Sequence, residues 1–160
     1  MSTVAEESST AGRELTLTRL IAVPREKVYR AWTEPELLKR WFAPSPYTTP
    51  HAELDVRSGG SNFIVMRDPD GNDMPLRGVY LEVVKNELIV FTDAFTEVWL
   101  PSEKPFFTGI ITFEDEDGKT RYTARARHWS EADCKAHEDM GFHEGWGLCA
   151  EQLAAVAAKL

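Results

Sequence analysis

The segment FFTGIITFEDEDGKTRYTARARH, residues 106–128, constrains the fold more than any other part of the chain. Asp117-Gly118 separates two runs in which apolar and polar residues alternate. A two-residue Asp-Gly loop favours a type I′ turn between antiparallel strands. This turn sets a register in which Phe107 lies opposite His128. A slip by one residue would invert both faces, so the clean separation of polarity supports the register.

The apolar face of this predicted hairpin has large residues at its ends and small residues in its middle. Its cross-strand pairs are Phe113 with Tyr122, Ile111 with Ala124, Gly109 with Ala126 and Phe107 with His128. Threonine and arginine side chains dominate the opposite face, as on a solvated sheet surface. The small residues leave space on the apolar face. Either a bulky side chain, with Trp146 as the obvious candidate, or a ligand fills that space.

A second hairpin is predicted around Asp70-Gly71. A two-residue loop at this position places Phe63 on the same face as Gly78 and Tyr80. A longer loop would shift this register. Because Gly78 again leaves space beside aromatic residues, we expect the hollow to continue here. Hollows of this kind are mostly apolar and hold a few polar groups.

The C-terminal part of the chain predicts a long amphipathic helix. Apolar residues recur there at steps of three and four, at Phe142, Trp146, Cys149, Leu153, Val156 and Leu160. Such a stripe marks one face of a helix, which we expect to lie across the sheet. A shorter helix precedes it. That helix begins at Ser130, in a sequence that resembles a capping box, and breaks near Gly141.

The remaining elements complete an α+β pattern. Residues 14–23 alternate at period two and predict a strand. Short helices follow at Pro24 and Pro35, because proline is favoured at a first helical position. Residues 51–129 then predict about six strands in a meander, joined by turns such as RSGGS.

Composition restricts the class of partner and the compartment. The net charge of -8 argues against nucleic acid or an anionic membrane as the main partner. No apolar run is long enough to cross a membrane. Residues 1–13 predict a flexible tail without signal-peptide features, followed by a single domain at 14–160. Since Cys134 and Cys149 do not make a disulfide framework, we expect a reduced, cytoplasmic protein.

Several motifs fail as metal, phosphate or nucleophile sites. Neither His137 nor His143 starts a zinc motif, because the residue four positions on is glycine in both cases. The DPDGND run lacks the spacing of a calcium loop, and RSGGS opens no helix that would bind phosphate. Cys134 and His137 lack a third, orienting group. We therefore expect no metal and no cofactor.

Two residues of the predicted hollow have side chains that suit acid–base chemistry or hydrogen bonding to a ligand. On the register above, His128 faces inward, where a neutral imidazole acts as a general base or orients a ligand. The alternative is a buried histidine that bonds to a neighbouring group. The same two interpretations hold for Tyr80. In an enzyme, Tyr80 or Tyr122 would donate a hydrogen bond to a developing oxyanion.

Three segments of the chain carry a family resemblance. TRLIAVPREKVYRAWTEPELLKRWFAP, RGVYLEVVKNELIVFT and GFHEGWGLCAEQL occur in this order. Together they resemble the START-like helix-grip superfamily (SRPBCC), in the branch named after activators of a heat-shock-protein ATPase. The resemblance covers residues 14–160. It implies a curved antiparallel sheet of six to seven strands wrapped around a long C-terminal helix, with two short helices after the first strand and a hydrophobic cavity.

The first functional hypothesis is a binding protein for a small hydrophobic molecule. The residues expected to line its cavity are Trp32, Phe63, Tyr80, Phe107, Tyr122, His128, Met140 and Trp146. An alternative is a cavity enzyme, such as a dehydratase, cyclase or isomerase, with His128 as acid and base. Another alternative is a module that contacts a chaperone. Self-association as a homodimer is left open.

Overall fold

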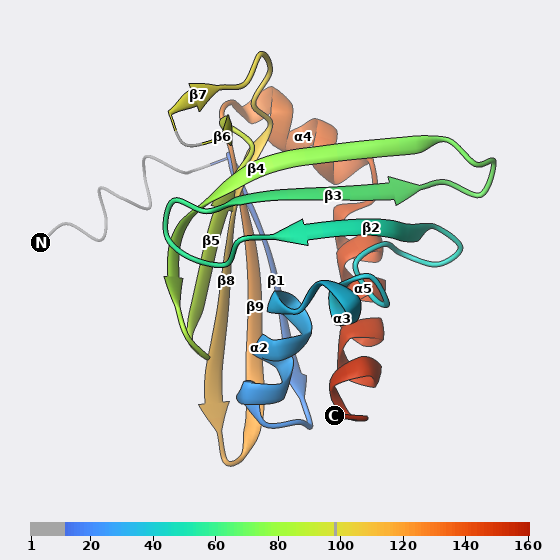
Figure 1. Ribbon diagram of the computed structural model, residues 1–160, viewed down its shortest axis with the longest axis vertical. Coiled ribbons are helices and arrows are strands. Elements are labelled where there is room, and N and C mark those ends of the chain that lie inside the picture. The colour runs from blue at the N-terminus through green and yellow to red at the C-terminus, as the bar shows by residue number, and fades with distance from the viewer. Residues whose placement is uncertain (1–11, 98) are drawn as a thin grey trace, which may run out of the picture.

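The computed structural model describes residues 12–97 and 99–160, and its elements follow the predicted order (Figure 1). They are β1 (Glu14–Ile21), α2 (Arg25–Thr33), α3 (Pro35–Leu38), β2 (Thr48–Leu54), β3 (Ser61–Arg67), β4 (Asp73–Val84), β5 (Leu88–Thr92), β6 (Phe95–Glu97), β7 (Leu100–Pro101), β8 (Phe107–Glu116), β9 (Lys119–His128), α4 (Glu131–Asp139) and α5 (Phe142–Ala157). Of the predicted N-terminal tail, residues 1–11 lie outside the described residues. The division into a tail and one domain stays a prediction.

Seven strands form one antiparallel sheet in the order β1-β9-β8-β5-β4-β3-β2. The sheet is strongly curved, because β2, β3 and the first part of β4 run across the molecule while β8 and β9 run along it (Figure 1). Helix α5 packs against α2 and β1, and α2 also packs on β8 and β9. We call the sheet face that meets these helices the inner face. This arrangement confirms the predicted helix-grip fold.

The hairpin of β8 and β9 has the predicted register throughout. Asp117 and Gly118 have φ angles of 54° and 82°, as the primed turn requires. Phe107 pairs with His128, and the pairing continues to the turn without a slip. The small residues Ala124 and Ala126 are fully buried on the inner face. A local turn signal therefore fixed the placement of twenty residues.

The predicted register of the β3–β4 hairpin is wrong by one residue. The loop has five residues rather than two, because the Asp68 carboxylate accepts hydrogen bonds from the backbone N–H groups of Asp70 and Asn72. Phe63 consequently pairs with Arg77. A shift of one residue exchanges the two faces of a strand.

The exchange moves Phe63 away from the inner face. Ile64 is instead buried in the core, and Phe63 lies on the outer face under the Arg77 guanidinium, whose carbon is 3.9 Å from the ring centroid. Tyr80 is on the inner side and buried, because it lies an odd number of residues after Arg77 on β4 and pairs with Phe91 of β5. The prediction that Phe63 lines an inner hollow is therefore incorrect.

The C-terminal helix buries the predicted stripe. Phe142 and Leu153 are fully buried, while Trp146, Cys149 and Val156 are partly buried against the core. The helix α4 before it begins where predicted, because the Ser130 hydroxyl accepts a hydrogen bond from the Asp133 N–H. Gly141, with φ of 92°, separates the two helices.

A small ribbon of β6 and β7 lies in the segment that connects β5 to β8. Asp93 holds the end of this excursion, since its carboxylate accepts hydrogen bonds from the N–H groups of Phe106 and Phe107. Burial raises the pKa of Asp93, and these hydrogen bonds act in the opposite direction. Aromatic residues before β8 are thereby held over the end of the sheet.

Candidate functional site

The middle of the inner face, where the sequence predicted a hollow, is filled. A side chain at Gly109 would place its Cβ 2.4 Å from the ring of Phe91, so this ring occupies the space that Gly109 leaves. Phe91 is the cross-strand neighbour of Gly109 on β5. The small residues do leave space on the sheet, as predicted. The side chain that fills it comes from the neighbouring strand β5 and not from a ligand or from Trp146.

Two predicted cavity residues, Trp32 and Tyr122, also belong to this packed middle. The Trp32 ring lies 5.9 Å from Phe91 and 4.9 Å from Trp41, between ring centroids. Its Nε1 donates a hydrogen bond of 3.2 Å to the Tyr122 hydroxyl. Burial raises the pKa of Tyr122, which therefore stays protonated. Both side chains have core partners in place of a ligand.

The end of the inner face at the start of β8 and the end of β9 is closed by rings. The rings that meet there are Phe106, Phe107, His128, His137, Phe142 and Trp146. Trp146 lies tilted against Phe142 at 4.8 Å and edge-on to Phe107 at 5.8 Å, measured between centroids. We call this cluster the closed end. It unites three predicted site residues, Phe107, His128 and Trp146.

A hydrogen-bonded pair of histidines lies inside the closed end. His128 and His137 are 4% and 8% exposed, and His128 Nε2 lies 2.8 Å from His137 Nδ1. His128 Nδ1 lies 3.0 Å from the carbonyl oxygen of Arg13. A carbonyl only accepts, so Nδ1 of His128 carries the proton and its Nε2 accepts from His137. Both ring nitrogens of His128 are therefore engaged.

His137 is the member of this pair that sequence reasoning assigned no role. Burial lowers the pKa of His137 to about 4, and the neighbouring His128 acts in the same direction. Cys134, one helical turn earlier, is buried on the same side of α4. Cys134 and His137 lie three positions apart and therefore share one face of α4. This spacing is the sequence signal that could have identified His137 as a buried residue.

The opposite end of the inner face is open. A cleft of about 550 Å³ lies there between helix α2 and the turns that follow β2 and β4. It is lined by Tyr29, Thr33, Val56, Arg57, Ser58, Val83 and Lys85. We call this cleft the open end. Its floor is partly aromatic, because Tyr29 packs edge-on against Phe113 at 5.6 Å between centroids.

Two glycines fix the wall of the open end. The N–H of Gly59 donates to the Tyr80 carbonyl, and the Tyr80 N–H donates to the Gly60 carbonyl, both at 2.8 Å. A Cβ on Gly60 would lie 1.8 Å from the carbonyl oxygen of Asp55, so only glycine fits. The RSGGS run is thus a turn, as predicted, and it holds Arg57 beside the cleft.

The tyrosines near the open end remain protonated hydrogen-bond donors. Burial raises the pKa of Tyr80, and the nearby Tyr29 and Asp55 act in the same direction. Burial also raises the pKa of Tyr29. Tyr29 lines the cleft itself. The predicted site residue Tyr80 lies behind the wall, where its backbone anchors the glycine turn.

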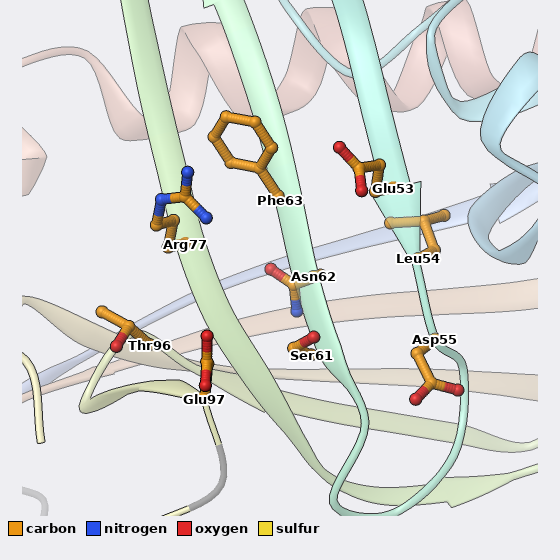
Figure 2. A pocket seen from close by; sticks show the side chains of 9 residues that line it. All are labelled: Glu53, Leu54, Asp55, Ser61, Asn62, Phe63, Arg77, Thr96 and Glu97. Carbon is orange, nitrogen blue, oxygen red and sulfur yellow. The ribbon is translucent and has the colours of Figure 1, made fainter. Parts of the chain in front are cut away.

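A second cleft, of about 400 Å³, lies on the outer face beside β6, whose residues Thr96 and Glu97 line it (Figure 2). Figure 2 shows Phe63 and Arg77 side by side on β3 and β4, with Glu53 on β2. Its lining is largely polar and includes the carboxylates of Glu53, Asp55 and Glu97. Phe63 thus lines the outer cleft, and the other predicted site residues line neither of the two clefts.

The last predicted site residue, Met140, is 75% exposed at the end of α4 and contacts no cleft described above. Within the described ranges, no three His, Cys, Asp or Glu side chains converge as a metal site would require. Cys149 is a packed thiol, since its Sγ donates to the Phe42 carbonyl and burial raises its pKa to about 12. None of the helices in those ranges is long and apolar enough to span a membrane.

A curved antiparallel sheet that holds a C-terminal helix, with two short helices after the first strand, places this protein among the START-like helix-grip proteins. The sequence pattern of the family described as "Activator of Hsp90 ATPase homolog 1-like protein" matches residues 22–158. The chain belongs to this family. The resemblance seen in the sequence is thereby confirmed.

Solved structures show the same fold. A protein from Nitrosomonas europaea is 40% identical, with a TM-score of 0.90 over 93% of this chain and 96% of the other. A protein from Mycobacterium smegmatis is 26% identical, with a TM-score of 0.78 over 92% and 91% of the two chains. An AHSA1-like protein from Aeromonas hydrophila, 17% identical, has a TM-score of 0.71 over 91% and 92%. No match was found among the curated proteins.

Proposed function

We propose that this protein binds a small molecule with an apolar body at its open end. The observation that carries the proposal is the cleft of about 550 Å³ between α2 and the two turns. Sites for small molecules have volumes of roughly 300–1,000 Å³ and combine apolar walls with a few polar groups. Tyr29, Val56 and Val83 supply the apolar part of the lining, which is otherwise more polar than in most such sites, with Thr33, Arg57, Ser58 and Lys85.

A ligand would bind at the open end because side chains fill the middle and the closed end of the inner face. Phe91 and Trp32 fill the space beneath the sheet, and six rings fill the closed end. A ligand in the open end would therefore rest on the Tyr29 ring and the two valines, and its affinity would come mainly from burial of apolar surface.

The proposal is tested by filling the cleft. Val83→Trp places a large side chain in the open end, and it should abolish the binding of 1-octanol in isothermal titration calorimetry. Val84→Trp is the matched control, because Val84 is exposed on the same strand and does not line the cleft. Equal binding by the wild type and Val83→Trp would refute the site.

The enzyme hypothesis with His128 as acid and base receives no support from the geometry. Both ring nitrogens of His128 are hydrogen-bonded inside the closed end, so neither reaches a substrate. A general base must lie within hydrogen-bond reach of the proton that it removes. The interpretation of a buried histidine bonded to its neighbours accounts for both contacts.

Contact with a chaperone of the Hsp90 type is a second candidate function. The family description names an activator of the Hsp90 ATPase. The β6–β7 ribbon supplies a surface for such contact, because Trp99 is 81% exposed beside the exposed Leu100. Exposed apolar groups of this kind mark interaction sites. Trp99→Ser should reduce capture by purified Hsp90, and Met140→Ser, at another exposed apolar residue, should not.

A further inference from the structure

We propose that the ligand of the open end carries a carboxylate or another anionic oxygen group, which Lys85 and Arg57 bind. This inference rests on the proposed function and concerns the chemistry of the same site. It follows from the charges at the cleft, from the groups already engaged there, and from the limited depth of the cleft.

The side chains that line the open end carry positive charge, whereas the chain as a whole is negatively charged. The protein has 26 acidic and 18 basic residues, yet the cleft lining contains two cations and no carboxylate. The outer cleft shows the expected bias, since three carboxylates line it with one arginine. A locally positive cleft in a negative protein concentrates anions relative to the rest of the surface.

Lys85 is the cation that is free to bind an anion. Within the described residues it forms no ion pair, whereas Arg57 pairs with Asp55 at 2.9 Å. The two side chains come from different turns, after β4 and after β2, so they approach the cleft from two sides. Lys85 thus supplies the primary charge, and the Arg57 guanidinium keeps donors available beyond those that Asp55 uses.

Tyr29 adds a neutral donor next to these charges. Its phenol lines the cleft, and among the described residues the hydroxyl has no hydrogen-bond partner. Burial raises its pKa, so it remains a donor at neutral pH. A carboxylate accepts several hydrogen bonds at once and satisfies this donor together with the ammonium group of Lys85.

The depth of the cleft restricts the apolar part. Phe91 and Trp32 block the space beneath the sheet, so a long chain has no path inward. The ligand class is therefore a short amphipathic acid, such as a medium-chain or monocyclic aromatic acid. Its apolar part would contact Val56 and Val83, and its acid group would lie between the two turns.

The experiment compares octanoate with 1-octanol, which share an apolar chain and differ in the acid group. By calorimetry at low ionic strength, octanoate should bind about tenfold more tightly than 1-octanol, as expected for two exposed charge pairs. Lys85→Met should reduce this ratio of affinities to about threefold, because only the pair with Arg57 then remains. Lys119→Met, at an exposed lysine in the β8–β9 hairpin, should keep the difference.

The outcomes separate the two proposals. Equal affinities for octanoate and 1-octanol in the wild type, or a preference for octanoate that Lys85→Met does not reduce, would overturn the anionic ligand and leave the proposed site intact. Failure of both probes to bind would overturn the proposed function itself. Raising the NaCl concentration should weaken only octanoate, because exposed charge pairs are screened by salt.

Discussion

The closed end and the open end of the inner face are built on the same hairpin, yet they meet different partners. At the closed end, Phe107 and His128 are covered by α4 and by the start of α5. At the open end, Phe113 is covered by Tyr29 of α2, beyond which two turns leave a cleft. The strands alone therefore do not decide where the fold has room.

The two ends also differ in whether their polar groups have hydrogen-bond partners. The two histidines of the closed end satisfy each other and the Arg13 carbonyl, so they are buried without an unpaired donor. At the open end, the Tyr29 hydroxyl and the Lys85 ammonium group have no hydrogen-bond or ion-pair partner among residues 12–97 and 99–160. One end is complete without a ligand, and the other offers groups that a ligand would satisfy.

Truncating the closed end should have the largest effect on stability. Phe142→Ala removes a fully buried ring that contacts Trp146 and His137, and should lower the free energy of unfolding by about 3–5 kcal/mol. Urea denaturation measures the change. Met140→Ala, at the exposed end of α4, should change it by less than about 0.5 kcal/mol. Similar losses in both variants would show that the closed end is not tightly packed.

The histidine pair should make the closed end sensitive to acid. Folding lowers the pKa of His137 from 6.5 to about 4, so the unfolded chain binds its proton first as the pH falls. Above pH 6.5, His137 is neutral in the folded and the unfolded state, and the full free energy of unfolding is present. As the pH falls towards 4, the unfolded chain binds the proton and this free energy decreases. At about 1.4 kcal/mol for each pKa unit, the loss is about 3 kcal/mol.

His137→Phe isolates this effect from the other titrating groups. The difference in unfolding free energy between the wild type and the variant should change with pH between 6.5 and 4, in favour of the variant at low pH. His143→Phe provides the control, because His143 is exposed at the start of α5. Parallel stability curves for the wild type and His137→Phe would contradict a buried neutral His137.

Adding one methyl group to the packed middle should cause an intermediate loss. Gly109→Ala forces a Cβ against the Phe91 ring and should cost about 1–3 kcal/mol in thermal or urea unfolding. The double variant Gly109→Ala with Phe91→Leu should recover part of the lost stability, because the smaller leucine leaves room for the added Cβ. A neutral Gly109→Ala would show that the hollow is empty after all, and would return the ligand to the middle of the groove.

The smallest stability effect is expected for a phenol at the open end. Tyr29→Phe removes a hydroxyl without a partner among the described residues and should change the unfolding free energy by less than about 0.5 kcal/mol. Tyr122→Phe removes the acceptor of the Trp32 N–H and should cost about 1 kcal/mol. A loss of similar size in both variants would mean that the Tyr29 hydroxyl already has a structural partner.

The sequence predicted the parts of this structure that local signals control. Asp117-Gly118 fixed the β8–β9 register, and the period of the C-terminal stripe identified the buried face of α5. The β3–β4 register was wrong because a side chain lengthened the loop. The Asp68 carboxylate captures two backbone N–H groups, and loop length sets which face each residue takes.

The candidate site was less predictable, because it depends on contacts between distant segments. The sequence identified the small residues beside Gly109, but not that Phe91 would cover them. It identified His128 as buried, but not that His137 of a separate helix would bond to it. The open end joins α2 to two turns far along the chain, and no periodicity within one segment reports such a meeting.

The most direct test of the account locates the ligand. In a ¹⁵N–¹H spectrum of the labelled protein titrated with octanoate, the backbone signals of Val56, Arg57, Ser58 and Lys85 should shift. The indole N–H signal of Trp146, at the closed end, should stay in place. Shifts centred on Trp146 and Phe107, with none at the two turns, would contradict the assignment of the open end as the binding site.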